Sequence, residues 1–351
     1  MATNVSELSM TSSQAAAPPR SRISAFDFMK GALVFVMVGY HWLNYFSDNQ
    51  SLYKYLRFLT PSFIFITGFL ISSVYLPRYD RRSWQIPARL LQRGLKLFLL
   101  FIGLNLTLWS LSAVNGGPAL LASRISLNSL LDLAISGSTH SADGKVASFY
   151  ILLPISYLLL VSSGVLSLLR FQRHAIEWAS AIAMLGALAL YQFGTENANL
   201  EMLAIGLLGV AIGCIPLATI TGVVMRPLLI VPAYLLYTVA IAVWDTLYPL
   251  QIVGVLLNLT ILYFLADRSD DSSRVSRCLL LLGKYSLFGY LVQLAILQVL
   301  ARAFRLIPES SVALGLTFIS APVLTVLAVV VLDRMRSRAP FVNTVYTAVF
   351  A

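Results

Sequence analysis

Long apolar runs separated by short polar connections dominate the chain. Runs of about twenty residues are long enough to cross about 30 Å of hydrocarbon as a helix. They occur at 24–46, 56–76, 91–112, 148–169, 175–193, 200–217, 223–243, 247–266, 279–300 and 311–332. The pattern predicts an all-α integral membrane protein with about ten transmembrane helices.

Composition supports this interpretation. The 351 residues are 58% hydrophobic and 11% charged, whereas ordinary soluble domains carry about 25% charged residues. The net charge is +10, but the basic residues form short clusters between apolar runs, which is typical of membrane topology and not of nucleic-acid binding. The two cysteines, Cys214 and Cys278, provide no disulfide framework and no metal-ligand cluster.

The distribution of Lys and Arg predicts the orientation, because cytoplasmic segments carry the excess of positive charge. With the N-terminus inside, only a minority of the 25 basic residues lies on the outer side: Lys54, Arg57, Arg124, Lys145, Arg302 and Arg305. Both termini are therefore predicted to be cytoplasmic.

Three regions follow from this topology. Residues 1–22 are rich in Ser, Ala, Thr and Pro and lack the apolar segment of a signal peptide, so we expect a disordered cytoplasmic tail. Residues 23–333 form the membrane domain. Residues 334–351 begin with three arginines and then become apolar and aromatic, which predicts a cytoplasmic or interfacial tail.

The first predicted helix carries three ionisable residues, which are costly inside a membrane and often functional. Asp27 and Lys30 are three residues apart and can pair on one helix face. His41 follows Lys30 by eleven residues, which returns it to nearly the same face about 16 Å further along the axis. The alternative is that Lys30 extends to the inner headgroups and that His41 belongs to an outer aromatic belt with Trp42 and Tyr45.

The stretch from Arg22 through Asp27, Lys30 and Gly31 to His41 resembles the opening helix of the membrane acyltransferase-3 superfamily. Lys30 stands where the family usually has Arg. Lysine keeps the positive charge but not the bidentate geometry of a guanidinium.

Further stretches fit the same resemblance. They are the apolar aromatic run from Pro61 to Gly68, the basic entry formed by Arg89, Arg93 and Lys96, the late segment from Gly283 to Gln293, and the segment from Phe149 to Leu160. The last of these is similar to the glucan succinyltransferases of the OpgC type. Gln293 stands where the family usually has His.

The resemblance implies O-acyl transfer from acyl-coenzyme A, a donor substrate on the cytoplasmic side, to a glycan or another hydroxyl acceptor. A neutral imidazole suits proton abstraction near pH 7, so His41 is the candidate general base or covalent acyl carrier. Lys30 could stabilise negative charge on the thioester oxygen, and Asp27 could orient Lys30. No bound cofactor or metal is expected.

Arg89, Arg93 and Lys96 can share one helix face and could bind the donor's phosphates, although positive-inside topology is the more common reason for such a cluster. The long outer connection at 112–147 contains His140 and Asp143, which could contact the acceptor.

The resemblance places the protein in the bacterial inner membrane. Two other functions are compatible with the pattern: a polytopic transporter or flippase, and a catalytically silent membrane scaffold.

Overall fold

The computed structural model describes residues 24–47, 50–78, 83–116, 127–137, 148–168, 172, 174–195, 197–224, 227–270, 272–306 and 310–350. Within these residues the secondary structure is helical and contains no strand. The main helices are α1 (Ser24–Phe46), α2 (Tyr53–Leu56), α3 (Leu59–Leu70), α4 (Gln85–Gly116), α6 (Leu127–Ile135), α7 (Leu152–Leu168), α8 (Ala175–Gln192), α9 (Ala198–Ile212), α10 (Leu217–Val224), α11 (Pro227–Trp244), α12 (Tyr248–Arg268), α13 (Arg274–Lys284), α14 (Ser286–Phe304), α15 (Ser311–Arg338) and α16 (Pro340–Phe350).

The helices have the membrane character that the sequence predicts. In the described part of the chain, six segments are long and apolar enough to cross a membrane: Tyr53–Arg78, Gln85–Leu111, Ala175–Gln192, Tyr248–Arg268, Ser286–Phe304 and Ser311–Arg338. Shorter apolar helices occur at Leu152–Leu168, Ala198–Ile212 and Leu229–Trp244. Helix α1 has 23 residues, but Asp27, Lys30 and His41 lower its hydropathy. The predicted spans coincide with helical segments, some of them with more than one helix, and the number of about ten and the orientation stay predictions.

One predicted boundary is wrong. The apolar run 279–300 crosses a break, because α13 ends at Lys284 and α14 begins at Ser286 with Tyr285 between them. The tyrosine has φ −113° and ψ 29°, which is not helical. No proline marks this break, so the hydrophobic pattern passes over it.

Helix α1 lies at the centre and packs against α3, α12, α13, α14 and α15. Its crossing with α13 is unusually close. A Cβ atom at Gly31 would lie 1.8 Å from the Leu279 carbonyl oxygen, and one at Gly283 would lie 1.6 Å from that of Asp27. Only glycine permits this approach of the two backbones. The crossing brings the charged start of α1 next to the end of α13.

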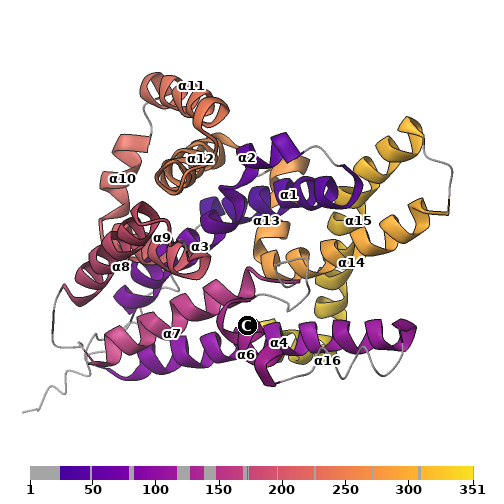
Figure 1. Cartoon of the computed structure of the whole chain (residues 1–351), viewed down its shortest axis with the longest axis horizontal. Coiled ribbons are helices and arrows are strands. Elements are labelled where there is room, and N and C mark those ends of the chain that lie inside the picture. The colour runs from indigo at the N-terminus through magenta and orange to yellow at the C-terminus, as the bar shows by residue number, and fades with distance from the viewer. Residues whose placement is uncertain are drawn as a thin grey trace, which may run out of the picture.

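Two further helix pairs pack closely. Helix α3 packs on α9, where a Cβ atom at Gly209 would lie 2.3 Å from the Phe65 carbonyl oxygen. Helices α4 and α7 run side by side along another edge of the molecule (Figure 1). Phe26, Met29, Leu33 and Met37 of α1 belong to the largest cluster of buried apolar side chains, together with Phe65 of α3.

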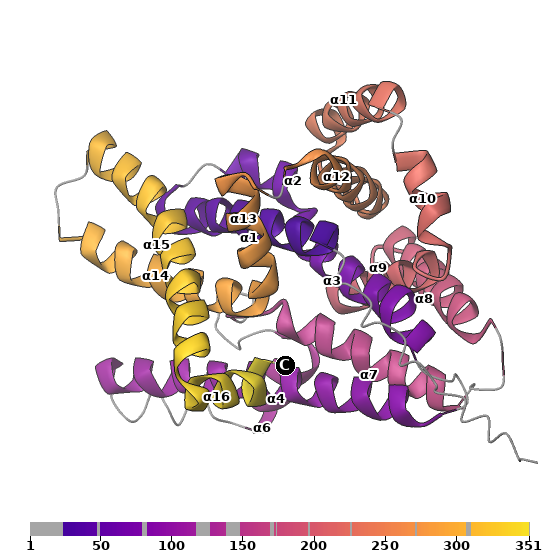
Figure 2. The same cartoon turned by 180° about the vertical axis from the view of Figure 1, so that it is seen from behind.

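The chain reverses direction at its C-terminal end. Helix α15 continues to Arg338, and α16 then turns back so that the C-terminus lies in the middle of the molecule, near α4 (Figures 1 and 2). The predicted tail at 334–351 is thus helical over its described part. It lies against the rest of the protein instead of extending away from it.

Candidate functional site

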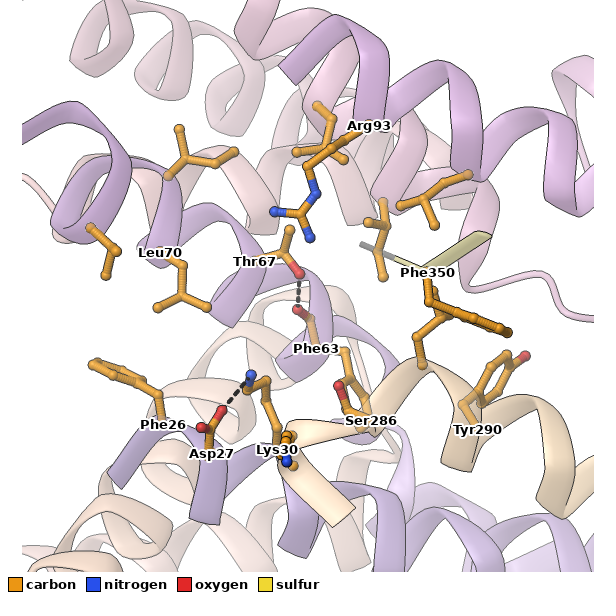
Figure 3. Close-up of a pocket in the computed structure, with 18 of the residues that line it drawn as sticks. Phe26, Asp27, Lys30, Phe63, Thr67, Leu70, Arg93, Ser286, Tyr290 and Phe350 are labelled. Atoms are coloured by element: carbon orange, nitrogen blue, oxygen red, sulfur yellow. Dashed lines mark hydrogen bonds and ion pairs between the residues drawn. The ribbon is translucent and has the colours of Figure 1, made fainter. Parts of the chain in front are cut away.

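A cavity of about 950 Å³ lies at the N-terminal end of α1, between several helices. Helices α1, α3, α4, α7, α14 and α16 all contribute to its wall (Figure 3). Six of its described lining residues are cationic: Lys30, Arg78, Arg93, Lys96, Lys284 and Arg336. Asp27 is the only carboxylate in this described lining. The balance of charges favours an anionic ligand.

The start of α1 supplies Asp27 and Lys30. Asp27 is 7% exposed, and the Lys30 ammonium lies 2.8 Å from its carboxylate. The pairing predicted from their spacing is therefore present, and both side chains line the cavity (Figure 3).

Helix α4 supplies Arg93 and Lys96. The Arg93 guanidinium donates to the Tyr75 hydroxyl and lies over the Tyr75 ring, 5.8 Å from its centre. Both basic residues line the cavity, as the donor-binding prediction requires, but Arg89 does not. Arg89 precedes Arg93 by one turn, about 6 Å along the axis, and so lies beyond this lining.

Three cations of the cavity were not predicted as site residues: Arg78, Lys284 and Arg336. Lys284 lies 2.9 Å from the carboxylate of Asp333. Burial alone would lower the pKa of Lys284, but hydrogen bonds to Asp333 and Tyr285 outweigh burial and raise the pKa above its usual value. Lys284 is therefore charged at neutral pH. The one signal in the sequence that could have indicated Lys284 as a site residue was its position inside the Gly283–Gln293 stretch.

His41 lies apart from this cavity. It is not among the described lining residues, because the eleven residues after Lys30 carry it about 16 Å further along α1. Its Nε2 atom is buried and has no hydrogen-bond partner among the described residues. The imidazole lies 5.3 Å from the ring centre of Tyr40 and 6.1 Å from that of Tyr290. Tyr290 also lines the cavity, so it connects the two regions.

Gln293 lies on the same face of α14, three residues after Tyr290. It is fully buried, and neither polar atom of its amide has a hydrogen-bond partner in the described part of the chain. Unpaired buried polar groups cost about 1–3 kcal/mol each. Such groups in the packing of α14 mark a place where a polar ligand or water would be stabilised.

The remaining predicted residues, His140 and Asp143, lie outside the described residues. Within the described residues no group of three or more His, Cys, Asp or Glu side chains could hold a metal ion. No family model, curated protein or solved structure matches the chain.

Proposed function

We propose that the protein is a membrane-embedded O-acyltransferase of the bacterial inner membrane. It moves an acetyl or succinyl group from cytoplasmic acyl-coenzyme A to a glycan or another hydroxyl acceptor at the outer face. The observation that carries the proposal is the cavity with six cations and one carboxylate in its described lining. Coenzyme A carries a diphosphate and a ribose phosphate, and charge-assisted hydrogen bonds to Arg and Lys suit such groups.

The donor would bind with its phosphates against Arg93, Lys96 and Arg336. Its flexible pantetheine arm would extend from the cavity past Tyr290 and carry the thioester toward His41. Lys30, about 16 Å from His41 along α1, would bind the anionic part of the donor in the cavity and not the acyl group. Asp27 would hold the Lys30 ammonium in place.

Transfer would begin when His41 accepts the proton of the acceptor hydroxyl. The hydroxyl oxygen then forms a bond to the acyl carbon, the carbon–sulfur bond breaks, and the coenzyme A thiolate takes the proton from the imidazolium. An unpartnered, buried imidazole nitrogen supports this role, because nothing in the described protein competes for it.

The test compares membranes that contain equal amounts of wild type, His41→Ala or His174→Ala protein. They receive radiolabelled acetyl- or succinyl-coenzyme A, and label is followed into the glycan fraction while free coenzyme A is measured. His174 is the matched control, since it is exposed and contacts Glu177 at 3.4 Å. We expect His41→Ala to abolish transfer and His174→Ala to retain it.

Equal labelling with His41→Ala would remove His41 from the mechanism. Substrate accumulation in vesicles without coenzyme A release would identify a transporter, and neither activity in the wild type would favour a silent scaffold.

A further inference from the structure

The C-terminal helix α16 covers one side of the basic cavity. Tyr346, Val349 and Phe350 of this helix line the cavity directly. Figure 3 places Phe350 beside Tyr290, at the side of the cavity away from Phe26. The ring of Phe350 also lies 6.1 Å from that of Phe288, two residues before Tyr290. The end of α16 therefore stands at the residue that connects the cavity to His41.

Helix α16 buries few side chains against the rest of the protein. None of its described residues is buried, and Phe341 and Val345 remain exposed. A helix without buried side chains gains little from apolar packing, so its docking depends on a few contacts.

Those contacts centre on Arg336, near the end of α15. The Arg336 guanidinium donates hydrogen bonds of 3.1 and 2.6 Å to the side-chain oxygen of Asn343 in α16. It also lies over the ring of Tyr346 at 4.0 Å and over that of Tyr285 at 5.3 Å. Tyr346 packs on Tyr285 with the ring centres 5.4 Å apart.

Arg336 is at the same time one of the six cations of the cavity. A phosphate would bind its guanidinium more strongly than the neutral amide of Asn343, because both partners are then charged and two oxygens can accept from the guanidinium in parallel. A polyanion in the cavity and the docked α16 therefore compete for one side chain.

We propose that α16 is a latch over the basic cavity, and that a bound polyanion opens it by taking Arg336 from Asn343. This inference rests on the proposed function only for the identity of the polyanion, the phosphates of coenzyme A. Binding of the donor would thus release α16 from the side of the cavity where Tyr290 lies.

Two substitutions of Asn343 act in opposite directions. Asn343→Ala removes the hydrogen bonds to Arg336 and loosens the latch, whereas Asn343→Asp replaces them with an ion pair and tightens it. Because apparent affinity scales with the open fraction, we expect Asn343→Ala to raise the affinity for coenzyme A about fivefold and Asn343→Asp to lower it similarly. Thr344→Asp is the matched control. The substitution adds the same charge at the neighbouring position, where the native Thr344 hydroxyl donates to the Pro340 carbonyl of its own helix.

The experiment places a nitroxide on α16 at Thr347→Cys, an exposed position, after Cys214 and Cys278 are replaced by Ser. Spin-label mobility and coenzyme A affinity are measured on the full chain in nanodiscs, with and without coenzyme A. We expect coenzyme A to mobilise the label in the wild type. Without ligand, the label should be mobile in Asn343→Ala and held in Asn343→Asp, while Thr344→Asp behaves as the wild type.

Mobility that coenzyme A and both Asn343 variants leave unchanged would overturn the latch. Equal effects of Asn343→Asp and Thr344→Asp on affinity and mobility would do the same, because they would reflect charge alone. The readouts are binding and mobility, so a functional latch in a protein without transfer activity would contradict the proposed function and leave the latch intact.

Discussion

The two halves of helix α1 have different surroundings, although their ionisable residues lie on one helix face. The N-terminal half, which is the inner half in the predicted orientation, carries the Asp27–Lys30 ion pair, crosses α13 backbone to backbone at Gly31, and opens into a cavity rich in cations. The outer half carries His41, which packs against aromatic rings and has an unpartnered nitrogen within the described structure. Helix periodicity therefore identifies which residues share a face, whereas the helices that pack on that face decide where binding and chemistry take place.

The largest expected effect concerns the crossing itself. Gly31→Ala would place a methyl group 1.8 Å from the Leu279 carbonyl oxygen, so the two backbones must separate, and we expect a loss of about 3 kcal/mol of stability. The control is Gly39→Ala in the outer half, where an added Cβ meets nothing within 4 Å. Thermal unfolding in detergent measures both. Equal effects at the two glycines would contradict the close crossing.

The next prediction distinguishes binding in the cavity from attraction by the overall positive charge of the protein. Arg93→Met removes a cation of the cavity but keeps most of the aliphatic stem, and we expect coenzyme A affinity to fall about tenfold to a hundredfold. Arg89→Met makes the same change one turn earlier on α4, outside the lining, and should change affinity less than about twofold. Equilibrium binding in nanodiscs checks the pair. Similar losses in both variants would mean that only the surface potential attracts the ligand.

A smaller effect concerns the uncharged outer region. Gln293→Leu replaces an amide without hydrogen-bond partners in the described structure by an apolar side chain of similar size. We expect the stability of the ligand-free protein to rise by about 1 kcal/mol while acyl transfer falls. Thermal unfolding and transfer assays on the same preparation measure both. A clear drop in stability would show that the amide is already satisfied and structural.

The smallest effect concerns the carboxylate of the cavity. Asp27→Asn removes the negative charge but keeps an oxygen that can accept a hydrogen bond from Lys30. We expect coenzyme A affinity to rise about threefold at low salt and the gain to shrink at high salt. Binding titrations at two ionic strengths test this. A lower affinity would mean that the full charge of Asp27 is required to position Lys30.

Much of the helical architecture could be predicted from the sequence, because the length of an apolar run is a local property. The break at Tyr285 was missed because amphipathic α13 passes into apolar α14 without a proline. The return of α16 over the cavity could not be predicted either. Its docking depends on Arg336, whose position in the chain is equally typical of positive-inside topology.

Those parts of the candidate site that lie on a single helix could be predicted from the sequence. The pairing of Asp27 with Lys30 follows from their spacing on α1, and the approach of Arg93 and Lys96 follows from theirs on α4. Lys284 and Arg336 join them only through tertiary packing. That the cavity ends before His41 was also hidden, because a shared helix face does not show where a cavity ends.

The central claim is that the inner half of α1 binds the donor and the outer half carries out the reaction. The most direct measurement compares Lys30→Gln with His41→Gln in one preparation, with coenzyme A affinity and acyl-dependent release of free coenzyme A as the two readouts. The account predicts weakened binding for Lys30→Gln, and wild-type binding without release for His41→Gln. Weakened binding in His41→Gln, or wild-type binding in Lys30→Gln, would contradict it.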